Sequence, residues 1–481
     1  MLTTATAEHQ PFASEKAAWA EQDPADWWHA CKTAIRAILN SKGVRPEDIE
    51  CIGLTGQMHG TVVLGKRGEV LRPSIIWCDQ RGAEEAKELT NLVGADRLLR
   101  LTCNTALTNF TLIKLLWLRA HQPDIWNRIH HLLLPKDYVR FCLSGEFGMD
   151  MAEASGTLML DVSRRQWSQE LLEQVGIPER WLPTLFESQE ICGRVSMSAA
   201  RETGLLEGTP IVAGAGDQAA GAVGMGITRS GRVSSIIGTS GVVFASTEAP
   251  FLDPKGRLHT FCHAIPNRWH VMGVTQAAGL SMRWFRDQLL GDAGQSWSYD
   301  RMTDEAAKTP PGADGLLWGP YLMGERTPHC DPDVRAGLVG IAAHHTRAHV
   351  LRAVMEGVAF SLRDTLTIFE ELRVPVTKIR VGGGGARSPL WRQIQADIFG
   401  NPVETVQVEE GPALGAALLA GVGAGVWPSV DDACDTVVRA ANHLNPRTEV
   451  VQLMNTQYKK YRQVYPALRS LSGSVHEVSY V

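Results

Sequence analysis

Short apolar strands and amphipathic helices alternate along almost the whole of this 481-residue chain. Five stretches are predicted to be strands because β-branched and other apolar residues gather in them between turn residues. They are DIECIGLTG, PSIIWC, RVSSIIGTSGVVFAS, RWHVMGV and TKIRVGGGG. Strands that interleave with helices in this way predict an α/β fold rather than a helical bundle or a β-sandwich.

The predicted helices carry clear start and stop signals. Asp23 is placed to cap a helix that has Pro24 as its first residue and apolar residues every three or four positions. The stretch from Ser388 follows the same logic and ends at Gly400. A longer amphipathic helix is predicted over HVLRAVMEGVAFSLRDTLTIF, and a last one opens at Pro446.

The length of the chain exceeds what one ordinary core accommodates, since a domain takes roughly 150 residues. We expect two lobes, residues 1–227 and 228–481, because a run of small residues ends at Gly226 and the basic turn TRSGR follows. Two lobes of similar mass predict a cleft between them, which is a common place for a ligand site.

The composition excludes several classes of protein. A net charge of −5 and a pI near 6.3 give no sign of a nucleic-acid partner. The nine cysteines form no CxxC pair, so neither a disulfide framework nor a zinc site is predicted and we assign no metal ligands. Free thiols suit a reducing cytoplasm, and we expect no signal peptide because the N-terminus has no basic stretch followed by an apolar one.

Residues 411–430, GPALGAALLAGVGAGVWPSV, contain no charge and are long enough to span a membrane. Five glycines and two prolines argue against a membrane helix. The pattern predicts instead a buried helix of small side chains that packs closely on a sheet or a ligand. We therefore expect no membrane partner.

Residues 212–226, VAGAGDQAAGAVGMG, contain one charged side chain, that of Asp217. It precedes QAAGAVGMG, so we expect it at the start of a short helix, where the partial positive charge favours a carboxylate and any nearby phosphate. The small neighbours allow a substrate to approach the backbone. A plain N-cap on a tightly packed helix explains the same pattern, and this stretch alone does not separate the two interpretations.

A predicted hairpin has Gly238, Thr239 and Ser240 at its tip, between two apolar runs. Such a tip offers backbone N–H groups and two hydroxyls, which can hold phosphate oxygens without a lysine. A hairpin turn with no ligand is the alternative.

Four glycines, Gly382, Gly383, Gly384 and Gly385, separate a predicted strand from a predicted helix. A flat ligand such as an adenine–ribose unit can lie against this bare backbone. The dinucleotide fingerprint fails because Arg387 stands where its third glycine belongs. The phosphate-loop motif also fails at residues 60–67, GTVVLGKR, where arginine replaces Ser or Thr and TVVL resembles a strand.

Two strand ends carry groups that could bind a polyol. His59, Asp79 and Arg81 supply directional hydrogen bonds, and Trp77 supplies an apolar face for a sugar. Residues 321–329, YLMGERTPH, have a similar mixture. Each segment is explained equally well as a loop whose polar side chains bond to one another.

Taken together and in this order, these groups resemble the FGGY carbohydrate kinases. One family signature fits AGLVGIAAHHTRAHVLRAVME throughout, whereas the other fits NFTLIKLLWLRAH in part. In the second, Thr111, Lys114 and Trp117 agree, but Asn109 and Ala120 fall outside the usual choices. The members to which the chain is most similar phosphorylate D-xylulose. That similarity rests on AEQDPADWW, GQMHG, RPSIIWCDQR, LLLPKDYVR, HTFCHAIPNRWHVM, PYLMGERTPH and EGPALGAALLA.

This resemblance implies two actin-like, ribonuclease-H-like lobes and transfer of the γ-phosphoryl group of ATP, with Mg²⁺, to a terminal hydroxyl of D-xylulose. It makes Asp217 the general base and Met58 and His59 sugar contacts, with the hairpin tip and the four glycines as phosphate and adenosine loops. Kinases of ribulose, gluconate or glycerol are alternatives, although GQMHG argues against glycerol. The expected partners are small molecules, and a homodimer is left open.

The sequence departs from the family in one respect. Family members usually begin with a strand that runs into Asp-x-Gly-Thr-Ser/Thr, whereas this sequence starts at MLTTATAEHQPF, which resembles the third strand. We therefore expect a first lobe without its N-terminal strands. Either the start is assigned too late and the full protein is an active kinase, or the chain is as given, with exposed sheet edges and impaired catalysis. The second case leaves a non-catalytic nucleotide-binding relative open.

Overall fold

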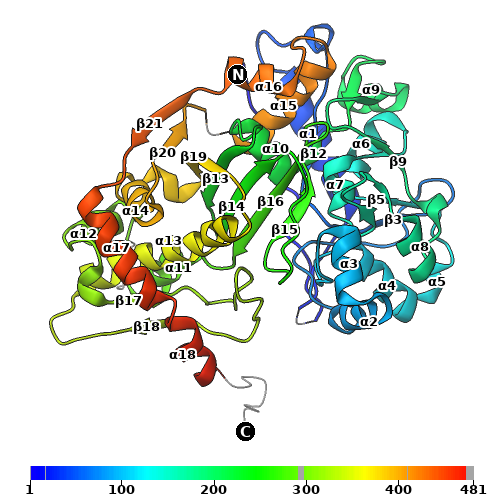
Figure 1. The fold of residues 1–481 in the computed structure, drawn as a ribbon. Helices are drawn as coiled ribbons and strands as arrows, with labels where there is room; N and C mark the ends of the chain where they lie inside the picture. Colours follow the sequence, from blue (N-terminus) through cyan, green and yellow to red (C-terminus); the bar gives the residue numbers. More distant parts are fainter. Residues whose placement is uncertain (1, 17, 291–296, 409, 473–481) are drawn as a thin grey trace.

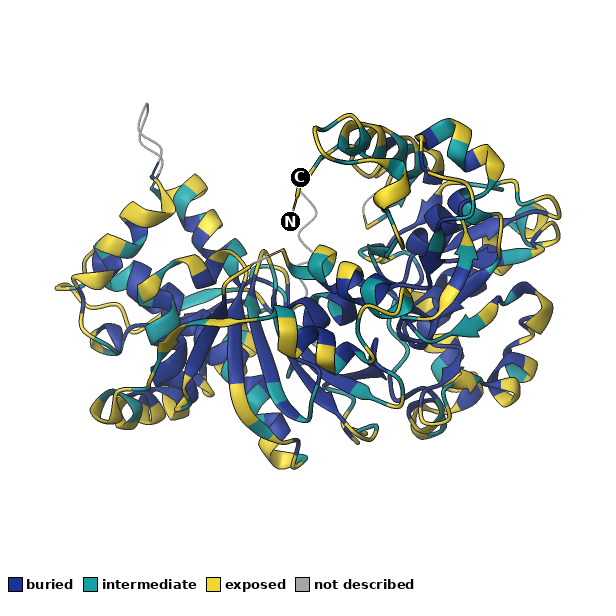
Figure 2. Cartoon of the chain, turned by 90° about the horizontal axis from the view of Figure 1, so that it is seen from above, coloured by how far each residue is buried: buried dark blue, intermediate teal, exposed yellow. Residues whose placement is uncertain are grey.

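A computed structural model describes residues 2–16, 18–290, 297–408 and 410–472. Figure 1 shows two lobes, the first running from blue to cyan and the second from green to red. Strands and helices interleave in both lobes, so the predicted α/β class is confirmed. Figure 2 shows that the central strands are almost continuously buried while exposed residues gather on the outer helices.

A seven-stranded sheet forms the centre of the second lobe. Its order is β15-β16-β14-β13-β19-β20-β21, with β13 antiparallel to β14 and parallel to β19. The strands are β13 (Gly231–Ile237), β14 (Gly241–Thr247), β15 (His259–Cys262), β16 (Trp269–Thr275), β19 (Val376–Gly382), β20 (Val403–Val406) and β21 (Ala440–Leu444).

One face of this sheet is covered by three helices, α13 (Arg347–Glu371), α14 (Pro389–Phe399) and α17 (Thr448–Tyr461). The hydroxyl of Ser388 accepts a hydrogen bond from the Trp391 N–H, as the predicted cap requires. Helix α17 begins two residues after the predicted Pro446. The remaining elements are α11 (Gly279–Trp284), α12 (Tyr299–Ala307), β17 (Leu317–Gly319), β18 (Gly337–Val339), α15 (Gly411–Gly423), α16 (Val430–Val437) and α18 (Val464–Leu471).

The described residues of the first lobe form no sheet larger than two strands. Its strand pairs are β1–β4, β2–β12, β3–β5, β6–β9, β7–β8 and β10–β11. The strands are β1 (Glu21–Gln22), β2 (Thr55–Gly56), β3 (Val62–Leu64), β4 (Ser74–Ile75), β5 (His131–Leu133), β6 (Gly148–Asp150), β7 (Leu160–Asp161), β8 (Gln166–Trp167), β9 (Thr184–Phe186), β10 (Ile191–Arg194), β11 (Pro210–Val212) and β12 (Ala215–Gly216).

Ten helices among the described residues surround these strand pairs. The first begins at Pro24, and Asp23 caps it by accepting a hydrogen bond from the Ala25 N–H at 2.9 Å. The helices are α1 (Pro24–Leu39), α2 (Ala83–Val93), α3 (Ala95–Thr102), α4 (Thr111–His121), α5 (Pro123–Trp126), α6 (Pro135–Ser144), α7 (Met151–Ser155), α8 (Gln169–Val175), α9 (Met197–Thr203) and α10 (Asp217–Gly224).

Helices α10 and α15, the two runs of small residues, cross each other at the top of Figure 1. A Cβ atom on Gly415 would lie 1.8 Å from the Ala220 carbonyl oxygen, and one on Gly224 would lie 2.2 Å from the Gly411 oxygen. Backbone therefore touches backbone, which only glycine permits. The prediction for residues 411–430 is confirmed in part: α15 ends at Gly423, buries one face, and packs mainly on α10 rather than on a sheet or ligand, and residues 424–426 are exposed. No described helix is both long and apolar enough to cross a bilayer.

Candidate active site

Asp217 is the first residue of α10, as the sequence predicts. The N-cap is Gly216, so the alternative in which Asp217 is itself the cap is wrong. Its side chain is half-buried, and its one hydrogen bond among the described residues is from the Gln218 side chain at 3.4 Å. Burial raises the pKa of Asp217 to about 6. The carboxylate is therefore unpaired and more basic than an ordinary aspartate.

Met58 and Glu153 lie against the backbone just before Asp217. A Cβ atom on Gly216 would lie 2.7 Å from Met58 Cγ and 3.4 Å from Glu153 Cδ. Glycine at 216 is thus needed to let these two side chains approach the backbone. The approach of a substrate to the small residues around Asp217 stays a prediction.

Glu153 is a residue that the sequence analysis missed. It lies in α7, is 0% exposed, and neither carboxyl oxygen has a hydrogen-bond partner among the described residues. Burial raises its pKa well above the ordinary value, and the nearby Asp150 and Asp217 raise it further. The charge of Lys136 opposes this rise in the pKa of Glu153. The only signal was a lone acid in a run of small residues, the same pattern that drew attention to Asp217.

A buried ion-pair cluster lies under Glu153. Lys136 Nζ contacts Asp137 Oδ1 at 2.6 Å and Asp150 Oδ2 at 2.9 Å, and all three side chains are 0% exposed. Lys136 also donates to the Ala213 carbonyl at 2.8 Å, a few residues before Asp217. Asp150 in turn accepts hydrogen bonds from the N–H groups of Ala152 and Glu153 at the start of α7. The cluster thus ties α6, α7 and the strand before α10 together.

His59 is buried and has a left-handed backbone, with φ 66°. Its Nδ1 lies 2.6 Å from the Gly156 carbonyl, so Nδ1 carries the proton and donates. Burial lowers the pKa of His59 to about 3, so the ring is neutral. Nε2, which has no partner among the described residues, is left as an acceptor.

Residues of the second signature segment support this arrangement from α4. The Thr111 hydroxyl and the Lys114 ammonium both donate to the His59 carbonyl, at 3.1 and 2.8 Å. Trp117 lies 4.8 Å from the Arg81 guanidinium. The signature residues that agree with the family are thus those that hold the predicted sugar contacts.

The three predicted sugar-binding residues after β4 differ in exposure to solvent. Trp77 is 50% exposed, whereas the Asp79 and Arg81 side chains are each 1% exposed. Arg81 contacts Asp79 at 2.8 Å and Glu21 at 2.6 Å, and Asp79 accepts from the Ala20 N–H. These ion pairs hold β1 to the segment after β4. A direct sugar contact by Asp79 or Arg81 remains a prediction.

The hairpin tip and the four glycines, which are far apart in sequence, lie side by side. A Cβ atom on Gly383 would lie 2.7 Å from the Ile237 carbonyl oxygen, next to the tip. Gly383 has φ 74°, which favours glycine. The tip is also fixed by a hydrogen bond from the Gly279 N–H to the Gly238 carbonyl, at 2.8 Å.

Both loops have the features of a phosphate and nucleotide site. The hydroxyls of Thr239 and Ser240 have no hydrogen-bond partner in the described part of the chain, and Thr239 is exposed. Gly238 to Ser240 join β13 to β14, as predicted. Of the four glycines, Gly382 is the last residue of β19, and Gly383 to Gly385 lie between β19 and α14. The donors at the tip and the bare backbone beside it fit a triphosphate and a flat base.

The segment 321–329 lies in the second lobe, and the charge of its Arg326 adds to burial in lowering the pKa of His59. Its Glu325 is buried in the second lobe and accepts hydrogen bonds from the Thr275 hydroxyl at 2.6 Å and the Gln276 N–H at 2.9 Å. Burial raises the pKa of Glu325 to about 7. Thr275 pairs with Gly241 across β14 and β16. Its hydrogen bond to Glu325 therefore connects this segment to the start of β14, next to the hairpin tip.

Comparison with known proteins gives a consistent result. Residues 2–224 match the FGGY family of carbohydrate kinases, N-terminal domain, and residues 233–424 match its C-terminal domain. The xylulose kinase of Bacillus subtilis (strain 168) is 38% identical over 470 residues, which cover 98% of this chain and 93% of that protein.

Solved structures agree with this match. A xyloylose kinase from Brucella ovis superimposes with a TM-score of 0.90 at 35% identity and covers 97% of this chain and 94% of its own. The xylulose kinase from Rhodospirillum rubrum gives a TM-score of 0.88 at 29% identity, with 96% and 93% covered.

Proposed function

Because the chain belongs to the FGGY family of carbohydrate kinases, we propose that its substrate is D-xylulose and its product D-xylulose 5-phosphate. The protein is a sugar kinase with the two-lobed, actin-like fold that the sequence predicts. Support for D-xylulose comes from xylulose kinases that match nearly the whole chain. The boundary at residues 227/228 and the homodimer stay predictions.

The observation that carries the proposed mechanism is the unpaired carboxylate of Asp217. In phosphoryl transfer the sugar hydroxyl forms a bond to the γ-phosphorus while the bond to the ADP oxygen breaks, and the hydroxyl proton must leave. Asp217 takes that proton. With a pKa of about 6 it is ionised at neutral pH and is a stronger base than a solvated aspartate.

The sugar is held by the side chains around Gly216. His59 Nε2 accepts a hydrogen bond from one hydroxyl, while Glu153, which is 0% exposed, supports the backbone beside Asp217 from inside the lobe. Met58 forms the apolar wall between them. We keep Trp77, which is exposed, as the proposed apolar face for the sugar, while Asp79 and Arg81 fix the loop that carries it.

Kinases of this family use ATP, which the second lobe would hold at the hairpin tip and the four glycines. Thr239 and Ser240 supply hydroxyl and N–H donors for phosphate oxygens, and Gly382 to Gly385 leave room for the adenosine. Mg²⁺ is a further part of the proposal. It is usually held by phosphates with one or two carboxylates, and it neutralises the charge that develops on the phosphoryl oxygens.

An ADP-release assay on this chain tests the substrate. We expect ADP release that depends on D-xylulose, and a single phosphorylated pentulose by mass spectrometry. D-ribulose, gluconate and glycerol serve as alternative substrates, and a reaction without sugar measures background hydrolysis. A higher kcat/KM for any of these than for D-xylulose would replace the substrate in the proposal without changing the reaction class.

A further inference from the structure

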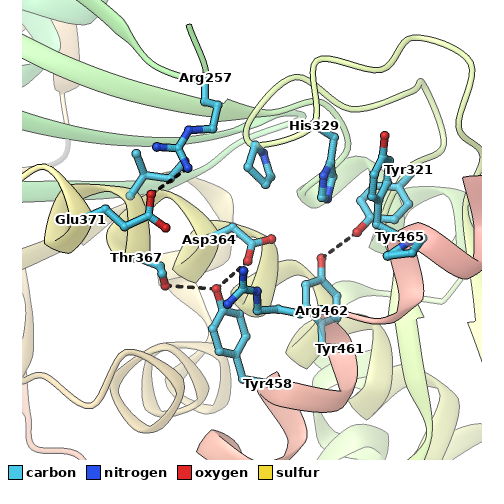
Figure 3. A pocket seen from close by; sticks show the side chains of 13 residues that line it. Arg257, Tyr321, His329, Asp364, Thr367, Glu371, Tyr458, Tyr461, Arg462 and Tyr465 are labelled. Carbon is cyan, nitrogen blue, oxygen red and sulfur yellow. Dashed lines mark hydrogen bonds and ion pairs between the residues drawn. The ribbon is translucent and has the colours of Figure 1, made fainter. Parts of the chain in front are cut away.

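A separate cavity lies inside the second lobe, between α13, α17, the start of α18 and the segment that follows β17 (Figure 3). Its volume is about 180 Å³. A water molecule takes about 30 Å³ in the liquid, so the cavity has room for about six waters or one small organic molecule. Tyr321, Pro328 and His329 of segment 321–329 line it, and its other lining residues belong to neither the sugar group nor the nucleotide group described above.

The floor of the cavity is the carboxyl group of Asp364, which is 7% exposed. Oδ1 accepts a hydrogen bond from the Tyr458 hydroxyl at 2.5 Å, and Oδ2 has no hydrogen-bond partner among the described residues. Burial raises the pKa of Asp364 to about 7, and no cation is paired with it in the described structure. An acceptor is therefore available inside a half-open cavity.

Aromatic rings form the walls. Tyr465 stacks on His329 with the ring centres 3.5 Å apart and the planes at 5°. Tyr321 donates its hydroxyl proton to the Tyr461 oxygen at 3.4 Å, which leaves the Tyr461 O–H free to donate. Figure 3 shows these rings around the same opening as Asp364. Flat apolar faces beside hydroxyl groups suit a ligand that has both C–H and O–H surfaces.

Within the part of the chain that the structure describes, one unpaired cation and one unpaired carboxyl group line the cavity. Arg462 is exposed, and its guanidinium has no hydrogen-bond or ion-pair partner among the described residues. Arg257 is already paired with Asp253 at 3.0 Å and with Glu371 at 2.8 Å. The two groups left for a ligand are thus one cation, Arg462, and one carboxyl, Asp364.

This pairing selects against charged ligands. A cation beside Asp364 would be repelled by Arg462, and an anion beside Arg462 would be repelled by ionised Asp364. A neutral molecule with several hydroxyls meets neither difficulty. Its hydroxyls donate to Asp364 Oδ2 and accept from Arg462 and Tyr461, while its carbon skeleton lies against the rings.

We propose that this cavity is a second carbohydrate site, which binds a small neutral polyol or monosaccharide between Asp364 and Arg462. The site is distinct from the one around Asp217, and the inference does not depend on which sugar the enzyme phosphorylates.

Xylitol is the probe for the test because it is neutral, small and lacks a keto group. Binding is measured by ligand-observed NMR on wild type, Asp364→Asn, Arg462→Ala and the control Arg439→Ala, which removes another exposed arginine. Asp364→Asn keeps an oxygen for the Tyr458 hydroxyl, and Arg462 is on the surface, so both variants should fold; thermal unfolding checks this.

We expect Asp364→Asn to weaken xylitol binding roughly tenfold or more, because hydrogen bonds to charged groups are the stronger kind. Arg462→Ala should weaken it as well, and Arg439→Ala should leave it unchanged. Crystals soaked in xylitol should hold it between Asp364 and Tyr461.

Three results would overturn the proposal. The first is equal affinity in wild type and both cavity variants. The second is xylitol found only beside Asp217 in the soaked crystals, or no binding at all. The third is tighter binding of tetramethylammonium or of xylonate than of xylitol at this cavity, which would replace the neutral ligand by a charged one.

Discussion

The two lobes place their functional groups by different means. In the second lobe, the hairpin tip and the four glycines lie at the ends of strands in a seven-stranded sheet, so a ladder of hydrogen bonds fixes them. In the first lobe, no described sheet exceeds two strands, and the groups around Asp217 are held by buried ion pairs and by close glycine contacts. The first lobe is therefore the more sensitive to loss of a single charge.

The largest effect is expected at the candidate base. Asp217→Asn should lower kcat by 10² to 10⁴-fold, the usual contribution of general base catalysis, without loss of stability because the carboxylate is unpaired. Steady-state kinetics and thermal unfolding measure the two effects. Asp300→Asn, an exposed aspartate at the start of α12, is the control. A variant that kept more than about a tenth of wild-type kcat would rule out the role.

The ion-pair cluster around Lys136 tests whether buried ion pairs hold the first lobe together. Lys136→Met leaves Asp150 buried without a cation and leaves Asp137 with only Arg140, 3.9 Å away, so the free energy of unfolding should fall by about 3–5 kcal/mol. Lys87→Met removes an exposed pair with Glu84 and should change stability by less than about 1 kcal/mol. Denaturant unfolding measures both. Equal effects would show that the buried cluster does not organise the first lobe.

The crossing of α10 and α15 offers a matched pair of substitutions. Gly415→Ala would place Cβ 1.8 Å from the Ala220 carbonyl oxygen, so the helices must separate at a cost of about 1–3 kcal/mol of unfolding free energy. Gly221→Ala, in the same crossing, meets nothing closer than 3.6 Å and should be neutral or slightly stabilising. If both substitutions behaved alike, close approach would not be what joins the lobes.

The smallest effect is a dependence on pH. Because the pKa of Asp217 is raised to about 6 and the base must be ionised, kcat/KM should fall about tenfold per pH unit below about pH 6 and level off above it. His59, with its pKa lowered to about 3, does not titrate in this range. A flat profile down to about pH 5 would mean that Asp217 keeps an ordinary pKa or is not the base.

Local signals in the sequence predicted local structure well. The caps at Asp23 and Ser388, the hairpin at Gly238 and the helix start at Asp217 all depend on a few adjacent residues, and the structure has each of them. The predicted strand DIECIGLTG is an exception, since only Thr55 and Gly56 form a strand with β12. A strand needs a partner, and the sequence of one strand does not specify its partner.

The sequence by itself determined the α/β class, the family and the positions of the glycine loops, because each rests on residue types at short, fixed spacing. Only the tertiary structure showed that Asp79 and Arg81 bond to each other, that Glu153 lies beside Asp217, and that Asp364 faces Arg462 across a cavity. These facts depend on which buried charges end up adjacent. Adjacency of residues far apart in the chain is set by packing, which spacing along the sequence does not reveal.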